Sequence, residues 1–265
     1  MSDTLTLMAR AAQDAAALLP RRTGPHGFDS WPAFKAAFDA VDRPTTALLR
    51  ERLEIALPGT AWAEEIDTDL PPGGEQWVVD AVDGAVQYLQ GLPQWSVSIA
   101  LVREGRPVLA ALHSAVLGHT YTAALGGGAF LDGAPITPSG KTDLSLALVA
   151  TSQPPFVGRQ PGAVADAGRA LSLLLPAVGA VRNLGPTSWQ LADVGSGRID
   201  AFYEYGRDAG NLLAGSLVAS EAGALVTDIN GRPWHPASPG FLAAPPALHG
   251  RILSLLATAR TTPAG

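Results

Sequence analysis

The hydrophobic pattern changes its period along the chain, and this change restricts the folds that the chain can adopt. Apolar residues recur at helical spacing in residues 3–19 and again from Thr45 to Leu57, after which proline and glycine end the second helix. From Trp77 the apolar residues form short strand-like runs separated by glycine turns, which predicts an antiparallel meander. The first half of the chain is therefore expected to be α+β.

The second half alternates between the two patterns. Strand-like runs such as LALVATS and AFYEY alternate with helical ones such as AVADAGRALSLLLPAV, which is typical of an α/β arrangement. Residues 138–145 separate the two patterns. We therefore expect an N-terminal α+β half over residues 1–140 and a C-terminal α/β half over residues 141–265.

Composition excludes several classes of protein. Of 265 residues, 18 are Lys or Arg and 24 are Asp or Glu, and the net charge of −6 argues against a nucleic-acid polymer as partner. The chain has no cysteine, which excludes disulfides, thiolate zinc sites and cysteine nucleophiles.

The N-terminal segment argues against secretion. Its helical pattern carries Asp3, Arg10 and Asp14, and it lacks the basic start and continuous apolar core of a signal peptide. No long run of uncharged apolar residues predicts a transmembrane helix. We therefore expect a cytoplasmic protein without a membrane partner.

Carboxylates are concentrated around one predicted strand. In QWVVDAVDG, Asp80 and Asp83 end an apolar run and are followed at once by Gly84. Taken alone, this is a common turn-and-cap pattern. Two further acidic positions change the interpretation, because a Glu64-Glu65 pair lies upstream and Asp208 stands directly before a long apolar helix.

If these carboxylates converge, they cannot all remain charged and unpaired, and a hard divalent cation is the simplest solution. Oxygen ligands favour magnesium, calcium or manganese. A helix that begins after Asp83 would direct the backbone N–H groups of Gly84 and Ala85 at an anion beside the metal. Metal-assisted hydrolysis of a phosphate ester is the reaction class that this pattern favours.

Other candidate sites have simpler explanations. His113 and His119 flank a predicted hairpin and are expected to be ordinary hydrogen-bonded residues. The glycines at 126–128 lack the strand-to-helix context of a dinucleotide site. Ser188 and Ser216 lack the G-x-S-x-G elbow of a serine hydrolase.

Three blocks of the sequence resemble signature segments of the inositol monophosphatase family, which belongs to the lithium-sensitive, magnesium-dependent phosphatases together with the fructose-1,6-bisphosphatases. They are AEEID, WVVDAVDGAVQYLQGLPQWSVSIALV and GRIDAFYEYGRDAGNLLAGSLVASEAGALVTDINGRPW. The hairpin segment GGGAFLDGAPI is also similar, and the likeness runs from about residue 40 to 236. The resemblance implies a layered αβαβα sandwich of the α/β class, with metal ions at the junction of its halves.

The resemblance also implies a set of metal ligands. Glu64 and Asp80, with the backbone carbonyl of Val82, match the ligands of a first Mg²⁺, and Asp80, Asp83 and Asp208 match those of a second. A third, weaker site in the family again uses the glutamate and water. Two or three Mg²⁺ ions are therefore implied, with Mn²⁺ as a substitute, and Glu64 and Asp83 count as catalytic.

Other matched positions concern the water and the substrate. Asp42, which precedes the helical pattern from Thr45, matches the catalytic aspartate that helps to hold the attacking water. Gly84 and Ala85 match the amides that face the phosphate, and Glu204 matches a glutamate that contacts substrate hydroxyls. Arg207 has two interpretations: an ion pair with its neighbour Asp208, or a group that faces a second anion on the substrate.

The sequence departs from the family pattern at several positions that the resemblance assigns to the active site. Ala85 replaces the signature threonine, whose hydroxyl positions the attacking water, and the loss of one such group typically costs on the order of 10²–10³ in rate. Arg207 replaces a tryptophan, and the loop from Glu204 to Asp208 is shorter than the family pattern. Ala81 and Gln87 replace a proline and an asparagine.

The resemblance therefore implies a Mg²⁺-dependent phosphomonoesterase that acts on a small phosphorylated substrate. Inositol, histidinol, sugar and 3′-nucleotide phosphates are the candidates, and the sequence does not choose between them. The alternative is a weakened or inactive family member that binds metal and a phosphate ligand in a regulatory role. Family members are commonly dimers, which suggests a homodimer, but no feature of the sequence decides the oligomeric state.

Overall fold

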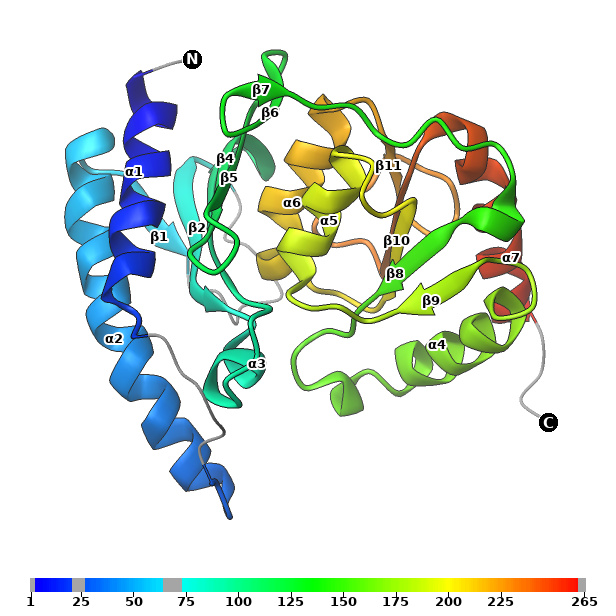
Figure 1. Cartoon of the computed structure of the whole chain (residues 1–265), viewed down its shortest axis with the longest axis horizontal. Coiled ribbons are helices and arrows are strands. Elements are labelled where there is room, and N and C mark those ends of the chain that lie inside the picture. Colours follow the sequence, from blue (N-terminus) through cyan, green and yellow to red (C-terminus); the bar gives the residue numbers. More distant parts are fainter. Residues whose placement is uncertain (1–2, 21–26, 64–72, 262–265) are drawn as a thin grey trace.

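Two β-sheets and three layers of helices alternate in the computed structural model, which describes residues 3–20, 27–63 and 73–261 (Figure 1). The resulting αβαβα sandwich confirms the expected fold class. The helices of the three layers, from the N-terminal side, are α1 (Asp3–Leu18) with α2 (Trp31–Ala56), α5 (Thr187–Gly195) with α6 (Ala209–Glu221), and α4 (Pro161–Leu174) with α7 (Pro246–Thr261).

The first sheet has seven strands that follow one another in chain order. All neighbours are antiparallel except β1 and β2, so the predicted meander is confirmed. One face packs on α1 and α2, and the other packs on α6. Its strands are β1 (Ala61–Ala63), β2 (Glu75–Asp83), β3 (Ser96–Arg103), β4 (Arg106–Ser114), β5 (His119–Ala124), β6 (Gly128–Leu131) and β7 (Ala134–Pro135).

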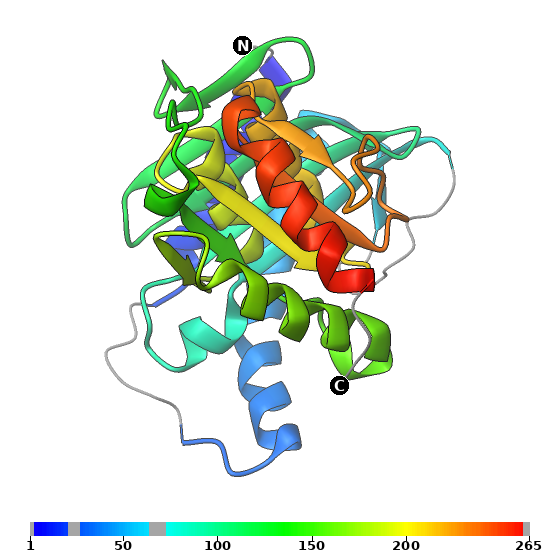
Figure 2. The ribbon, with the colours of Figure 1, turned by 90° about the vertical axis from the view of Figure 1, so that its right-hand side faces the viewer.

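The second sheet has five strands in the order β11-β12-β10-β8-β9. Strand β8 pairs in parallel with both β9 and β10, whereas β12 runs antiparallel to its neighbours. Figure 2 shows α7 lying across the outer face of this sheet, beside α4. The strands are β8 (Leu148–Thr151), β9 (Ala180–Arg182), β10 (Ala201–Tyr205), β11 (Leu225–Thr227) and β12 (Gly240–Ala244).

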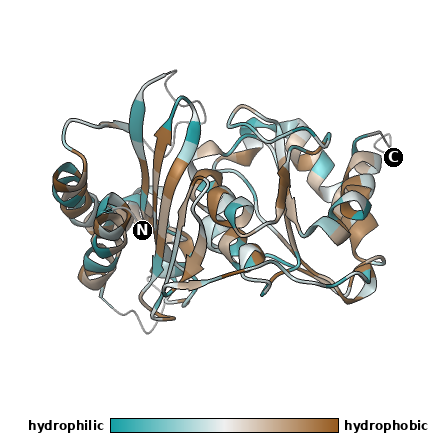
Figure 3. Ribbon diagram, turned by 90° about the horizontal axis from the view of Figure 1, so that it is seen from above, coloured by the Kyte–Doolittle hydropathy of each residue, from teal (hydrophilic) through white to brown (hydrophobic). Residues whose placement is uncertain are grey.

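Three short helical turns complete the described chain: α3 (Ala85–Leu89), η1 (Leu144–Leu146) and η2 (Val157–Arg159). The strands of the first sheet lie within residues 61–135 and those of the second within residues 148–244. The division into two folding halves near residue 140 stays a prediction. Figure 3 shows hydrophobic residues concentrated on the strands, while α1 and α2 carry hydrophilic stripes on their outer sides. Among the described residues, no helix combines the length and apolar character that crossing a bilayer requires.

Helix α2 is longer than predicted, and one expectation about it is wrong. The helix begins at Trp31, where the Ser30 hydroxyl accepts a hydrogen bond from the backbone N–H of Ala33, and it continues through Pro44. Ion pairs from Lys35 and Arg43 to Asp39 span its first half. Asp42 therefore lies inside the helix and does not precede it, because the cap and these pairs maintain the helix despite the proline.

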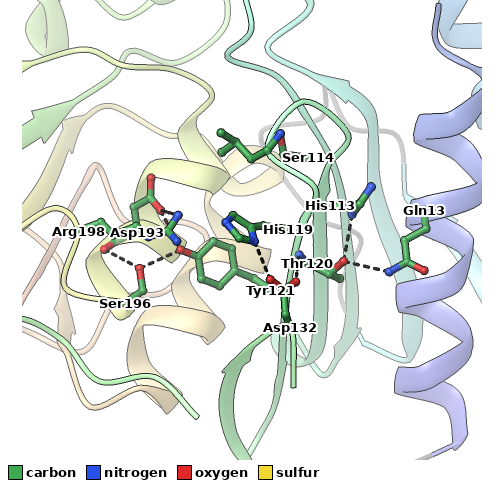
Figure 4. A network of polar contacts seen from close by, with 11 residues as sticks. Gln13, His113, Ser114, His119, Thr120, Tyr121, Asp132, Asp193, Ser196 and Arg198 are labelled. Carbon is green, nitrogen blue, oxygen red and sulfur yellow. Dashed lines mark hydrogen bonds and ion pairs between the residues drawn. The ribbon is translucent and has the colours of Figure 1, made fainter. Parts of the chain in front are cut away.

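A polar network connects α1, the first sheet and α5 (Figure 4). The Tyr121 hydroxyl donates to Asp193 Oδ1 at 2.8 Å, and its ring packs edge-on against Trp189. On the preceding residue of β5, the Thr120 hydroxyl accepts a hydrogen bond from Gln13 Nε2 at 3.0 Å. Burial raises the pKa of both Tyr121 and Asp193, so the contact fixes the first sheet on α5 through groups that are costly to leave unpaired.

Helices α5 and α6 cross at a glycine, which yields a first prediction. A Cβ atom at Gly215 would lie 2.5 Å from the carbonyl oxygen of Ser188 and 2.6 Å from Leu191 Cβ. We expect Gly215→Ala to destabilise the protein by about 1–3 kcal/mol, because the two helices would have to separate. Urea unfolding followed by tryptophan fluorescence measures this change as a lower midpoint.

Gly168 in α4 is the matched control, because no heavy atom lies within 4 Å of a Cβ built there. Gly168→Ala should stabilise the protein by up to about 1 kcal/mol through helix propensity alone. A pair of substitutions with equal effects would contradict the assignment of Gly215 to a close helix crossing.

Candidate active site

The site is built around a sharp turn at the end of β2. Gly84 adopts φ of +90° between β2 and α3, and a Cβ atom at this position would lie 2.8 Å from the carbonyl oxygen of Gln94. Only glycine fits both constraints. The turn leaves Asp83 at the strand end and places Ala85 at the first helical position, where the backbone N–H has no partner within the helix.

Asp83 is buried and held from the other half of the chain. It is 3% exposed, and the hydroxyl of Ser188, the second residue of α5, donates a hydrogen bond to its Oδ2. Burial raises the pKa of Asp83 to about 7; the Ser188 hydrogen bonds oppose this change, and the negative charge of Asp208 adds to it. Ser188 is thus a residue of the site, although its sequence context suggests neither this contact nor a nucleophile.

Asp208 lies just before α6 and approaches Asp83 from the second sheet. It is 4% exposed, and its Oδ1 accepts a hydrogen bond from Asn211 Nδ2 at 2.7 Å. Burial raises its pKa to about 6, against the opposing effect of the Asn211 hydrogen bonds. Its Oδ2 has no hydrogen-bond partner within the part of the chain that the structure describes.

Glu204, on β10, completes a series of buried carboxylates. Its side chain is 0% exposed, and neither of its oxygens accepts a hydrogen bond from the described residues. Burial raises its pKa well above the usual range, and the neighbouring Asp208 carboxylate raises it further. Asp83, Asp208 and Glu204 therefore form one series of buried carboxylates, in which the charge of Asp208 acts on both of the others.

These oxygens suit a hard cation. Three buried carboxylate oxygens, both from Glu204 and Oδ2 of Asp208, lack a donor in the described protein. An unsatisfied buried carboxylate is costly, and an all-oxygen donor set is the one that Mg²⁺ or Mn²⁺ prefers. The donor chemistry therefore fits the group that the sequence implies.

Asp80 and Val82 lie on the same strand as Asp83. Asp80 is half-buried, and its Oδ1 accepts a hydrogen bond from the backbone N–H of Val82 at 2.9 Å. In a regular strand, residues three apart face opposite sides of the sheet. The pairing of β2 with β3 shifts between Asp80 and Asp83, and such an irregularity allows both to turn toward one side.

The charges and the hydrogen bond that act on Asp42 come from its own helix, so its place at the site stays a prediction. The charges that act on half-buried Asp42 come from Asp39, Arg43 and Lys35 of its own helix, and its carboxylate accepts a hydrogen bond from Thr46. Burial is the main cause of its raised pKa.

Glu64 lies outside the described residues. Within residues 3–20, 27–63 and 73–261, no three carboxylate or histidine side chains are already placed to hold a metal ion. The complete ligand set of the resemblance, and its water-binding aspartate, stay predictions.

Arg207 lies at the outer edge of the site and is exposed. The side chain of Gln160 holds its backbone from both sides: Arg207 N–H donates to Oε1 at 2.9 Å, and Nε2 donates to the Arg207 carbonyl at 3.2 Å. The short segment before Asp208 is therefore fixed to the start of α4.

Comparisons with known proteins point to one family. Residues 34–261 match the model of the inositol monophosphatase family. The inositol-1-monophosphatase of Mesorhizobium japonicum is 32% identical over 235 residues, which are 87% of each chain. The Nus factor SuhB of Pseudomonas aeruginosa is 33% identical over 195 residues, which are 72% of each chain.

Solved structures are similar over almost the whole chain. SuhB of Mycobacterium tuberculosis superposes with a TM-score of 0.78 at 29% identity, covering 96% of this chain and 95% of the other. An IMPase of Thermotoga maritima superposes with a TM-score of 0.81 at 23% identity, covering 97% and 98%, and shows the fold alone.

The raised pKa values predict how stability depends on pH in the absence of metal. In EDTA, folded Asp83 and Asp208 keep protons that the unfolded chain releases near pH 4, so the free energy of unfolding should fall as the pH rises from about 4 to about 7. Asp83→Asn cannot ionise and still accepts a hydrogen bond from Ser188. We expect this variant to be more stable than the wild type in EDTA at pH 7, by urea unfolding.

Asp143→Asn is the matched control. Asp143 is exposed, and hydrogen bonds from Ser145 lower its pKa, so its ionised form stabilises the fold and its removal should not stabilise the protein at pH 7. If Asp83→Asn and Asp143→Asn destabilise equally at pH 7, the charge on Asp83 is not the cause of the pH dependence.

Proposed function

The chain belongs to the inositol monophosphatase family, and from this premise we propose that it is a metal-dependent phosphomonoesterase that hydrolyses a small hydroxylated phosphate. The observation that carries the proposal is the series of buried carboxylates at the junction of the two sheets, in which three oxygens lack any donor among the described residues. A bound divalent cation is what such a series needs.

The proposed ligands are those that the resemblance implies. Asp83 and Asp208 lie at the junction, Asp80 and the carbonyl of Val82 lie beside them on β2, and Glu64 is the remaining one. We propose two or three Mg²⁺ ions, for which Mn²⁺ can substitute. Bound cations of this kind polarise the phosphoryl group and make an attacking water more acidic.

The protein's own residues orient the reactants. Ser188 and Asn211 each donate a hydrogen bond to a carboxylate of the site, so neither Asp83 nor Asp208 is free to rotate. The backbone N–H groups of Gly84 and Ala85 are proposed to donate to phosphate oxygens, which the left-handed turn at Gly84 makes feasible. Asp42 is proposed to help hold the attacking water.

Several relatives are named inositol-1-monophosphatases, which supports a phosphorylated polyol as substrate. Arg207 is exposed at the edge of the site and is proposed to face a second anionic group, so histidinol, sugar and 3′-nucleotide phosphates belong in the same test. We further propose a homodimer, as is common in the family, and a cytoplasmic location, which suits a chain without cysteine.

A second candidate function rests on Ala85. A site without the signature hydroxyl can bind metal and phosphate while hydrolysing slowly or not at all. Two relatives are named Nus factor SuhB, which is not the name of an enzyme. A binding or regulatory protein would show a higher melting temperature with Mg²⁺ and ligand, without release of phosphate.

Phosphate release tests the first candidate. With Mg²⁺ and a panel of the four phosphate classes, we expect turnover that EDTA abolishes and that Asp83→Asn reduces at least about 10²-fold in kcat/KM. Asp143→Asn, a substitution of an exposed aspartate distant in sequence from the site, serves as the control and should match the wild type. If the wild type hydrolyses none of the substrates faster than Asp83→Asn does, the proposal of a phosphatase is rejected.

Restoring the hydroxyl separates the two candidates. Ala85→Thr adds a hydroxyl at the first position of α3, and we expect it to raise kcat by on the order of 10²-fold. Ala85→Val has nearly the same shape without the hydroxyl and should give no increase. Equal rates for Thr and Val would mean that the attacking water is positioned by another group.

A further inference from the structure

The alternation of β10 decides where Glu204 points. Tyr203 and Tyr205 pack with the outer helices α4 and α7, whereas Phe202 packs with α5 and α6 between the sheets. Because successive side chains of a strand face opposite sides, Glu204 shares the side of Phe202. Its carboxylate therefore points into the layer that also contains Asp208.

The connection from β10 to α6 keeps Glu204 and Asp208 together. Gly206 adopts φ of +105°, and its N–H donates to the carbonyl of Pro239 at 2.9 Å. A Cβ atom there would lie 2.8 Å from Pro154 Cγ. With the backbone of Arg207 held on both sides by Gln160, the chain returns at once to Asp208, so the shortened loop keeps the carboxylates of Glu204 and Asp208 close to each other.

Burial separates the available roles for Glu204. A residue that forms hydrogen bonds with substrate hydroxyls must be accessible from the open side of the site, yet Glu204 is 0% exposed. A proton shared with Asp208, which lies close enough to Glu204 for a side-chain hydrogen bond, would use only one oxygen of each group. A cation between the two side chains would satisfy both Glu204 oxygens and Oδ2 of Asp208, which are the three that lack a partner among the described residues.

We propose that Glu204 is a cation ligand that completes, together with Asp208, the metal site of this chain, and that it does not contact the substrate. The inference rests on the proposed function, because the cation is the one that the phosphatase uses. On this proposal, exposed groups such as Arg207 recognise the substrate, and Glu204 does not.

Metal binding without substrate tests the inference. Isothermal titration with Mn²⁺ on the EDTA-stripped, dialysed protein compares the wild type with Glu204→Gln, and we expect the affinity to fall at least about tenfold. Asp208→Asn should weaken binding similarly, and adding Glu204→Gln to it should cost little more if the two act on one cation.

Glu221→Gln is the control, because it makes the same change of side chain at another glutamate. Glu221 accepts hydrogen bonds from the backbone N–H groups of Gly126 and Gly128, away from the site, so its substitution should leave Mn²⁺ affinity unchanged. If Glu204→Gln does not fold, Glu204→Asp keeps the charge but withdraws the carboxylate by one methylene, and it should also bind Mn²⁺ more weakly. Far-ultraviolet circular dichroism establishes that each variant is folded.

The outcomes are distinguishable. Unchanged Mn²⁺ affinity in folded Glu204→Gln or Glu204→Asp overturns the inference and leaves the phosphatase standing. Unchanged affinity together with a raised KM for the phosphorylated substrate assigns Glu204 to substrate hydroxyls instead. A wild type that binds no Mn²⁺ or Mg²⁺ overturns both the inference and the proposed function.

Discussion

The burial of several carboxylates at one junction is the constraint on which the site depends. Asp83 arrives from the first sheet, and Asp208 and Glu204 arrive from the second, so like charges are placed close together away from water. Such an arrangement opposes folding until protons or cations neutralise it. The core of each half must therefore be extensive enough to hold the carboxylates in place, and both sheets are covered by helices on both faces.

Core packing and site geometry are coupled at the crossing of α5 and α6. Gly215 of α6 has no side chain, so the backbone of Ser188 in α5 can lie directly against it. The same Ser188 donates its hydroxyl to Asp83, and the same helix α6 begins just after Asp208. The close approach of two helices thus brings a hydrogen-bond donor and a carboxylate from the second half to the end of β2 in the first.

Periodicity predicted those parts of the fold whose pattern extends over several turns or strands. Helix α1, the meander from β2 to β5, and the segments β10 and α6 follow their hydrophobic patterns. Strands β1 and β9 have only three residues each, which is too short to show a period. In the sequence, the pattern of α2 was recognised only from Thr45, whereas the Ser30 cap and the charge pairs of the first turns begin the helix at Trp31.

The site could be predicted in part for a similar reason. Asp83 and Asp208 stand at the ends of elements with clear patterns, so their convergence followed from the topology that the resemblance implies. Ser188 gave no local signal, because its partner Asp83 is 105 positions away and a serine at the start of a helix is common. The shortened loop before Asp208 was visible in the sequence, but its effect on Glu204 required the strand direction and the backbone contacts of Arg207.

The two departures from the family pattern act in the same direction. Ala85 provides no hydroxyl to position water, and in the metal site proposed above the carboxylate of Glu204 is an additional ligand of the cation. Each added negative ligand binds a divalent cation more tightly but offsets more of its charge, so the cation draws less electron density from a phosphoryl group or a water. Both changes therefore favour holding metal and phosphate over rapid turnover. We therefore expect the proposed site to bind metal and phosphate while hydrolysing its substrate slowly.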